Sequence, residues 1–258
     1  MTETDRGLRV DIADSLAILT IDRPQARNAL DLATADALKQ AVLAIEADDR
    51  VRAAVITGSE GRFCAGADLR EMADKGAVYR PWAGADGPLA RPCTKPVIAA
   101  VEGHAVAGGL GVALWADLRV ASETAVFGVF CRRFGVPMSD GTPTRLPRLI
   151  GQARALDMLL TGRPVPGAEA LNFGLADRLV PAGQALETAK ELARQIAGFP
   201  PEAMRADRAA AFASFDGPEA DCMIREAEGA ERAKQTEAQA GAARFRDGAG
   251  RSGSFTSG

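Results

Sequence analysis

The sequence predicts an α/β core followed by a helical C-terminal region. Short runs of strand-forming residues alternate with helical patterns up to about Leu146, and this alternation is typical of α/β architecture. Beyond Leu146 the pattern is mostly helical. Of the 258 residues, 47% are hydrophobic and 25% are charged, which is enough for a sizeable buried core. We expect a core over residues 1–182, helices over residues 183–246 and a flexible tail over residues 247–258.

Charge and rare residues exclude several classes of function. The 31 basic and 34 acidic side chains give a net charge of −3, so the chain lacks the basic excess of nucleic-acid and membrane-surface binders. The chain has one histidine, His104, and one subunit therefore cannot build a multi-histidine metal site. The four cysteines lack zinc-binding spacing, which indicates reduced thiols. We expect a small-molecule partner, no nucleic acid and no metal.

The lengths of the apolar segments predict where in the cell the protein is located. The first ten residues, MTETDRGLRV, are polar and lack the apolar run that directs export. The longest run of apolar residues and glycine, Ala105 to Ala116, is shorter than the roughly 20 residues that cross a bilayer. We expect a cytoplasmic protein with no membrane partner.

Local patterns predict the elements of the core. Asp31 is a suitable N-cap for a helix over Leu32 to Ala47, and a second helix is expected to end near Ala116. The buried face of the first helix is expected to comprise Leu32, Ala35, Leu38, Val42 and Ile45. Strands are expected at Leu8 to Ile12, Leu16 to Ile21, Ala53 to Thr57, Val97 to Val101 and Leu118 to Ala121.

Helical patterns dominate the rest of the chain. Candidate helices are Ala153 to Leu160, Ala168 to Phe173, Gln184 to Ala197 and Glu219 to about Ala238. Between the core elements, the segment Met72 to Pro92 carries glycines and the aromatic residues Tyr79 and Trp82. Two interpretations remain open for it: a lid or pocket wall, or a surface insertion.

Two glycine turns are candidate anion sites. Arg62 to Leu69, RFCAGADL, follows a strand and precedes a helix, where unpaired N–H groups are partly positive. An ordinary tight turn capped by Asp68 is the alternative. The second turn, Gly103 to Gly111 (GHAVAGGLG), follows another strand. A helix is expected to begin at Gly108, so the N–H of Gly108 can point out of the helix N-terminus toward a negative charge. Two such backbone donors on one oxygen would form an oxyanion hole, which stabilises an enolate.

These turns carry a resemblance to a known family. Together with Arg23 to Leu30, Ile98 to Leu118 and Leu159 to Pro181, they resemble the crotonase, or enoyl-CoA hydratase/isomerase, superfamily. The resemblance implies a spiral of ββα units, a C-terminal helical region that forms trimers, and a homotrimer or a hexamer of two trimers. It also implies an acyl-CoA thioester as substrate, with coenzyme A as part of that substrate and no separate cofactor.

The resemblance also implies roles for individual residues. The N–H groups of Ala67 and Gly108 would hold the thioester oxygen. Coenzyme A would lie along Ala26, Arg27, Ala65, Asp68 and Leu69, and the Arg27 side chain would bind its phosphates. The alternative for Asp68 is that it caps the following helix.

The sequence departs from the hydratase pattern at two positions. Hydratase members use two glutamates to hold and activate water, and here those positions read Gly111 and Cys131. Loss of one positioned acid or base costs about 10² to 10⁴ in rate, so ordinary hydration is disfavoured. Cys131 is interpreted as a small buried residue in the space of the missing glutamate, with a reactive thiol as the alternative.

Asp140 is the candidate replacement. It lies in the loop FGVPMSDGTPTRLPRLIG, where family members with isomerase-type activity place an acidic residue. A carboxylate in an apolar pocket has its pKa raised by desolvation, which suits an acid/base near neutral pH. The alternatives are that Asp140 caps the helix near Thr142 or pairs with Arg145.

The predicted activity is therefore enolate chemistry on a thioester, with Asp140 moving a proton. Isomerisation of an enoyl-CoA double bond needs one such carboxylate, whereas addition of water normally uses two. A catalytically silent acyl-CoA-binding protein is the alternative, as is a decarboxylase or thioesterase that uses the same oxyanion hole.

Overall fold

The computed structural model describes residues 3–75, 82 and 84–250 of the chain. The polypeptide divides into two compact units, Met1–Ile196 and Ala197–Gly258. The second unit begins at the last residue of the helix Ala185–Ala197, whereas the predicted helical region begins at residue 183. Residues 251–258, which make up most of the predicted tail, lie outside the described residues.

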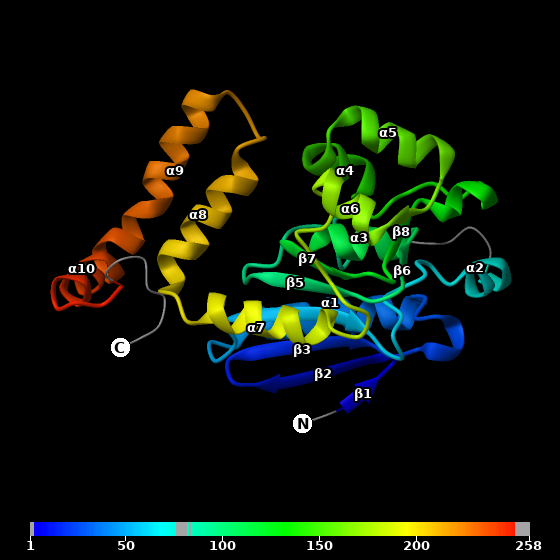
Figure 1. Cartoon of the computed structure of the whole chain (residues 1–258), viewed down its shortest axis with the longest axis horizontal. Coiled ribbons are helices and arrows are strands. Elements are labelled where there is room, and N and C mark those ends of the chain that lie inside the picture. The colour runs from blue at the N-terminus through cyan, green and yellow to red at the C-terminus, as the bar shows by residue number, and fades with distance from the viewer. Residues whose placement is uncertain (1–2, 76–81, 83, 251–258) are drawn as a thin grey trace. The chain divides into compact units, whose positions relative to one another are not determined.

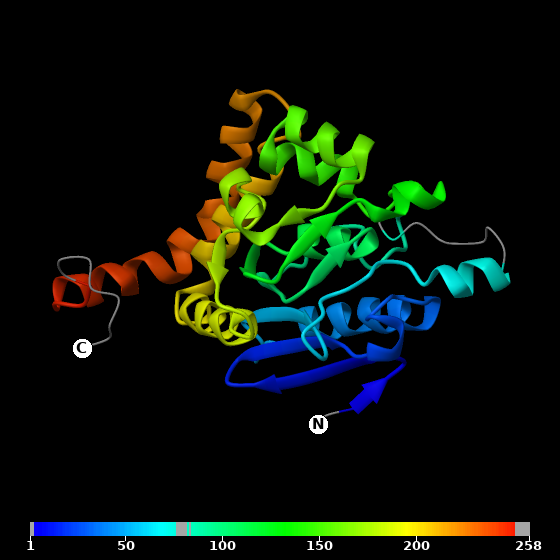
Figure 2. The same ribbon diagram turned by 45° about the vertical axis from the view of Figure 1, so that its right-hand side comes forward.

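A seven-stranded mixed sheet forms the base of the first unit, and the colour order in Figures 1 and 2 follows it from blue to green. Its first three strands are antiparallel and the remaining neighbours are parallel. In spatial order the strands are β1 (Glu3–Asp5), β2 (Leu8–Ala13), β3 (Leu16–Ile21), β4 (Ala53–Gly58), β5 (Val97–Val101), β7 (Leu118–Ser122) and β10 (Arg178–Val180). All five predicted strands are thus confirmed.

A second, three-stranded sheet was not predicted. It consists of β6 (His104–Val106), β8 (Val126–Gly128) and β9 (Val165–Pro166), in that order. β6 follows β5 after two residues, and β8 follows β7 after three, so the chain twice runs from the large sheet into the small one. The first of these strand pairs continues directly into α3 (Gly108–Trp115), which gives one ββα unit.

Helices and short helical turns complete the first unit. The 3₁₀ turns are η1 (Pro24–Ala26) and η2 (Phe130–Phe134). The remaining helices are α1 (Leu32–Ala47), α2 (Leu69–Lys75), α4 (Thr142–Ile150), α5 (Gln152–Thr161), α6 (Gly167–Phe173) and α7 (Ala185–Ala197). Among the described residues no helix is both long and apolar enough to cross a bilayer.

Helix α1 shows how local sequence fixes an element. The Asp31 carboxylate accepts a hydrogen bond from the N–H of Thr34 at 2.8 Å, as the predicted N-cap requires. Ala35, Leu38, Val42 and Ile45 are buried, as predicted. Leu32 is 36% exposed, so its predicted burial was wrong. It is the first helical residue, and its side chain lies beside an open groove instead of the sheet.

An ion pair between a buried arginine and a partly exposed aspartate joins β7 to the segment before β10. Arg119 on β7 is 2% exposed, and its guanidinium lies 2.9 Å from the Asp177 carboxylate. It also donates to the carbonyl oxygens of Leu175 and Ala116, at 2.6 and 3.0 Å. Burial lowers the pKa of Arg119, against the opposing charge of Asp177. β7 and the segment before β10 are therefore held together by an interaction that needs both partners.

The second unit consists of helices. Figure 1 shows α8 and α9 side by side. The elements are α8 (Pro201–Ala213), α9 (Glu219–Ala233), a π-helical turn at Lys234–Ala238 and α10 (Gln239–Arg246). The Glu237 carboxylate accepts hydrogen bonds from the N–H groups of Glu202 and Ala203, at 3.1 and 3.0 Å, and so caps α8. Helix α8 was not predicted. The trimer or hexamer implied for this region stays a prediction.

Asp177→Ala is expected to destabilise the first unit by about 3 kcal/mol, because the buried Arg119 charge loses its carboxylate partner and keeps only carbonyl oxygens. Denaturant unfolding measures this loss. Asp36→Ala, which removes an exposed pair with Arg6, is the matched control and should change stability by less than about 1 kcal/mol. Equal losses in the two variants would contradict the role assigned to Arg119.

Candidate active site

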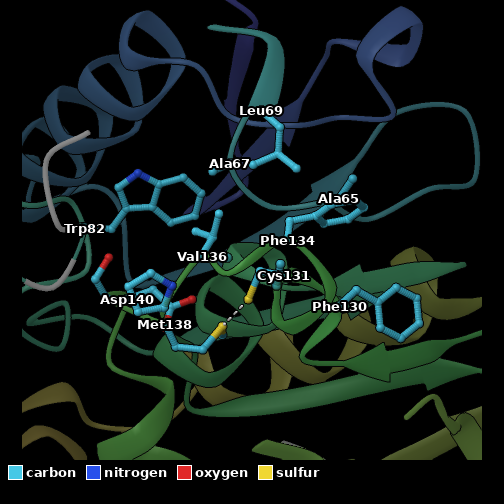
Figure 3. Close-up of a pocket in the computed structure, with 14 residues that line it drawn as sticks. Ala65, Ala67, Leu69, Trp82, Phe130, Cys131, Phe134, Val136, Met138 and Asp140 are labelled. Atoms are coloured by element: carbon cyan, nitrogen blue, oxygen red, sulfur yellow. Dashed lines mark hydrogen bonds between the residues drawn. The ribbon is translucent and has the colours of Figure 1, made fainter. Parts of the chain in front are cut away.

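One cavity of about 90 Å³ gathers most of the predicted site residues (Figure 3). Its walls are largely apolar. The cavity is lined by Ala65, Ala67, Leu69, Trp82, Ala107, Gly108, Phe130, Cys131, Phe134, Val136, Pro137, Met138, Ser139 and Asp140. The predicted donors Ala67 and Gly108 and the predicted acid/base Asp140 therefore face the same space, although they come from three separate segments.

The first glycine turn presents the N–H of Ala67. Gly66 has a φ of +95°, in the left-handed region that favours glycine. A short parallel bridge holds the turn, because Leu30 N–H donates to Gly66 O at 2.7 Å and Asp68 N–H donates to Leu30 O at 2.9 Å. The N–H of Ala67, between these two bonds, takes no part in the bridge.

The second glycine turn presents the N–H of Gly108. Ala107 has φ 51° and ψ −126°, a strained conformation for a residue with a side chain. Gly108 then begins α3, so its N–H has no partner within the helix. Both predicted donors thus follow a residue with positive φ, which turns the next N–H group away from the chain's own carbonyls.

The two turns are in direct contact. A Cβ atom on Gly66 would lie 2.7 Å from the backbone nitrogen of Gly108. A Cβ atom on Gly109 would lie 2.1 Å from the carbonyl oxygen of Cys64. Within the part of the chain that the structure describes, neither Ala67 N–H nor Gly108 N–H has a hydrogen-bond acceptor. The site therefore offers two unpaired donors on adjoining backbone.

Among the described residues that line the cavity, Asp140 is the one that carries a carboxyl group. It is 3% exposed and precedes α4, and its Oδ1 accepts a hydrogen bond from Thr142 N–H at 2.9 Å. Burial raises the pKa of Asp140, against the lowering effects of this hydrogen bond and of the Arg145 charge. The capping alternative is therefore partly correct, because the carboxylate does satisfy a donor at the start of α4.

Arg145 does not neutralise this carboxylate by direct contact. Its guanidinium donates to the backbone oxygens of Asp140 and Leu89, at 3.2 and 2.7 Å. Burial lowers the pKa of Arg145 itself. Arg145 therefore fixes the backbone of the loop and forms no ion pair with the carboxylate of Asp140.

Both positions that depart from the hydratase pattern adjoin Asp140. A Cβ atom on Gly111 would lie 2.4 Å from the Cγ atom of Asp140 and 2.5 Å from its Oδ2. The Asp140 carboxylate thus fills the space into which a side chain at position 111 would project. Cys131 lines the same cavity from η2. This neighbourhood was invisible in the sequence, because Gly111 and Asp140 belong to different elements.

The environment of the two cysteine thiols near the cavity favours their neutral form. Burial raises the pKa of Cys64 to about 12, and burial followed by the charge of Asp140 raises the pKa of Cys131. The Cys131 Sγ lies 3.1 Å from the Sδ atom of Met138 (Figure 3). This environment matches the interpretation of Cys131 as a small buried residue and does not activate a thiolate.

The residues predicted to bind coenzyme A fall into two groups. Ala65 and Leu69 line the cavity, whereas Ala26 and Arg27 lie just outside it. Arg27 has a φ of 54°, its side chain is exposed, and its carbonyl oxygen accepts a hydrogen bond from Ala65 N–H at 3.2 Å. The loop at Arg27 therefore adjoins the cavity mouth, and the contacts with coenzyme A stay a prediction.

Asp68 is already occupied by protein partners. Its carboxylate lies 3.0 Å from the Arg23 guanidinium and accepts hydrogen bonds from the N–H groups of Arg70 and Glu71 at the start of α2. Burial acts to raise the pKa of Asp68, but the Arg23 hydrogen bond and these N–H groups lower it overall. These contacts correspond to the capping alternative, and its predicted contact with coenzyme A is untested.

Several wall residues were not singled out from the sequence. Four of them lie on η2 and on the loop before Asp140: Phe130, Phe134, Val136 and Met138. The apolar character of this segment was the only sign in the sequence that it could line a pocket. Trp82 lines the cavity, as the pocket-wall interpretation of its segment predicted, whereas Tyr79 lies outside the described residues.

Neither the single histidine nor a metal centre belongs to this site. His104 is exposed and packs edge-on against Phe130, with ring centroids 6.4 Å apart, and it does not line the cavity. Within residues 3–75, 82 and 84–250, no group of three or more histidine, cysteine, aspartate or glutamate side chains is placed to hold a metal ion.

Comparison with known proteins assigns the family. The sequence profile of the family described as enoyl-CoA hydratase/isomerase matches residues 11–248. The chain belongs to the enoyl-CoA hydratase/isomerase family. It is 40% identical over 198 residues to the enoyl-CoA hydratase EchA19 of Mycobacterium tuberculosis, covering 73% of this chain and 74% of the relative. It is also 40% identical over 212 residues to a probable enoyl-CoA hydratase of Rhizobium meliloti, covering 78% and 80%.

The solved structures agree with this assignment. A crystal structure of an enoyl-CoA hydratase from Mycobacterium tuberculosis superposes with a TM-score of 0.88 at 34% identity, over 94% of this chain and 96% of that one. The crotonase-type fold expected from the resemblance is therefore confirmed, and the chain is an enzyme of the enoyl-CoA hydratase/isomerase family.

The substitution Asp140→Asn is expected to increase the free energy of unfolding of this protein at neutral pH. A carboxyl whose pKa is raised by folding binds its proton more tightly in the folded state, so wild-type stability falls as pH rises through that pKa. Asparagine can keep the Thr142 hydrogen bond and does not titrate. The expected gain is on the order of 1 kcal/mol near pH 8 and disappears near pH 4. Thermal unfolding at both pH values measures it, and a pH-independent loss would mean that Asp140 serves only as a cap.

Proposed function

We propose that this protein is an acyl-CoA enzyme that moves the double bond of an enoyl-CoA thioester. The observation that carries the proposal is the single cavity shared by the unpaired N–H groups of Ala67 and Gly108 and the buried carboxyl of Asp140. Two donors and one acid/base are the groups that this reaction requires.

The proposed reaction uses one carboxylate twice. The Asp140 carboxylate removes a proton from the carbon next to the thioester carbonyl of a 3-enoyl-CoA. The electron pair of the broken C–H bond moves to the thioester oxygen, and the resulting dienolate is held by the N–H groups of Ala67 and Gly108. The protonated Asp140 then returns the proton to the fourth carbon, which gives the 2-enoyl-CoA and restores the carboxylate.

The energetics of the site suit this sequence of steps. Each backbone donor in an oxyanion hole contributes about 3 to 4 kcal/mol to transition-state stabilisation. The start of α3 adds partial positive charge at Gly108. Because burial raises the pKa of Asp140, its conjugate base is a stronger proton acceptor than an ordinary aspartate.

Hydration is disfavoured by the composition of the cavity. Water addition normally uses a pair of carboxylates, and Asp140 is the carboxyl among the described lining residues. The position of its carboxylate beside Gly111 supports the view that it replaces a missing side chain there. A silent acyl-CoA binder, a decarboxylase and a thioesterase remain the alternatives to isomerisation.

Asp140→Asn is expected to lower kcat about 10² to 10⁴-fold without loss of thioester binding, because only the proton transfer is removed. The assay follows the ultraviolet absorbance of the conjugated 2-enoyl thioester formed from 3-enoyl-CoA substrates, and mass spectrometry of the product separates isomerisation, which leaves the mass unchanged, from hydration, which adds water. In the wild type, kcat/KM should fall at low pH through a pKa above that of an ordinary aspartate.

Asp49→Asn is the control for this experiment, because Asp49 is exposed beyond the end of α1 and outside the cavity. Added water at a normal enzymatic rate would overturn the isomerase proposal. Tight thioester binding with no turnover of any substrate would favour the silent binder.

Arg27→Ala is expected to weaken binding of coenzyme A about twofold to fivefold, because an exposed charge pair contributes less than about 1 kcal/mol. The difference between wild type and variant should shrink as salt is added. Isothermal titration calorimetry measures both effects. Arg178→Ala, which removes an exposed arginine on β10, is the control, and an equal effect there would exclude a specific contact at Arg27.

A further inference from the structure

Trp82 separates two hollows of the first unit. Its indole lines the cavity that contains Asp140, and it also lines a groove of about 670 Å³ along α1. The side chain is 4% exposed, so it is packed between the two spaces. No other residue lines both hollows among the residues that the structure describes.

The indole ring lies directly over the second glycine turn. A Cβ atom on Gly108 would lie 2.1 Å from Cζ3 of Trp82 and 2.6 Å from its Cη2. Figure 3 shows Trp82 and Asp140 on one side of the cavity and Phe130 on the opposite side. The indole therefore forms a wall of the cavity beside the proposed reacting groups.

The cavity on the Asp140 side of Trp82 is small. An apolar protein cavity of about 150 Å³ accommodates one benzene ring of six carbons, so about 90 Å³ accommodates roughly four carbons. The groove on the far side of Trp82 is several times larger. Its walls are Leu32, Ala35, Asp36 and Lys39 of α1 and the segment 84–88.

The far wall of this groove is attached to the helix. Lys39 Nζ donates a hydrogen bond to the carbonyl oxygen of Asp86 at 2.8 Å, which ties the segment 84–88 to α1. Leu32 and Ala35 supply an apolar floor, and Leu32 is 36% exposed there. The groove has the volume for a hydrocarbon chain and offers it the apolar floor at Leu32 and Ala35, with Asp36, Lys39 and Asp86 as polar parts of its lining, but Trp82 separates it from the cavity.

We propose that Trp82 is the residue that determines acyl length, and that the substrates are thioesters of short acyl groups, of about four carbons. This inference rests on the proposed function, because it assumes that the acyl group lies beside Asp140. Removing the indole joins the cavity to the groove along α1 and lets a longer acyl chain reach the apolar floor at Leu32 and Ala35.

The test measures binding of saturated, unreactive thioesters, so that it does not depend on turnover. Butyryl-CoA and dodecanoyl-CoA are titrated by calorimetry into wild type, Trp82→Ala and Trp82→Phe, each checked for folding by circular dichroism. The wild type should prefer butyryl-CoA. Trp82→Ala should shift the ratio of the two affinities toward dodecanoyl-CoA by about tenfold or more, because each methylene placed in an apolar pocket contributes about tenfold or more. Trp82→Phe should give an intermediate ratio.

Trp115→Phe is the matched control. Trp115 is the other tryptophan of the chain, is 3% exposed, and bonds to the carbonyl oxygen of Arg91 at 2.8 Å outside both hollows. Its replacement should leave the affinity ratio unchanged, and the remaining fluorescence should respond to butyryl-CoA through Trp82.

The outcomes separate the two proposals. An affinity ratio that is unchanged in folded Trp82→Ala and Trp82→Phe overturns the role of Trp82 and leaves the proposed function standing. A wild type that prefers dodecanoyl-CoA also overturns the short-acyl assignment. Absence of binding by either thioester to the wild type overturns the proposed function, and this inference with it.

Discussion

The site depends on one close contact between two backbone turns. Gly66 lies against the nitrogen of Gly108, and Gly109 lies against the carbonyl of Cys64, at separations that leave no room for a Cβ atom. This contact brings two unpaired N–H groups to one cavity. The strained conformation of Ala107, which costs on the order of 1 to 3 kcal/mol, is tolerated because the surrounding core holds the turn.

Burial of a single carboxyl gives this cavity its chemical character. An apolar wall raises the pKa of Asp140, which lowers stability at neutral pH and increases the basicity of the carboxylate. The fold brings together the two unpaired N–H groups, and Gly111, Cys131 and Asp140 lie beside one another next to them; in the proposed function these residues decide which reaction the donors serve. Activity is thus a property of these few side chains rather than of the fold.

Much of the fold could be predicted from local pattern. The long strands β3 and β4 and helix α1 carry enough residues for their periodicity to be visible, and Asp31 marks the start of α1. The small sheet was missed because its strands are two or three residues long, too short for a periodic signal. Helix α8 was missed although Pro201 marks its first residue, because its alanine-rich sequence lacks a distinct apolar stripe.

The sequence by itself determined which segments carry backbone donors, because glycines mark tight turns before a helix. Its resemblance to the family singled out Asp140 as the candidate acidic residue, because family members place such a residue in that loop. Only the tertiary structure decided that Asp140 fills the space beside Gly111, that Arg145 bonds to backbone instead of to the carboxylate, and that Trp82 divides the cavity from a groove. These are contacts between residues far apart in the chain, and no local pattern encodes them, because they arise only when separate elements pack together.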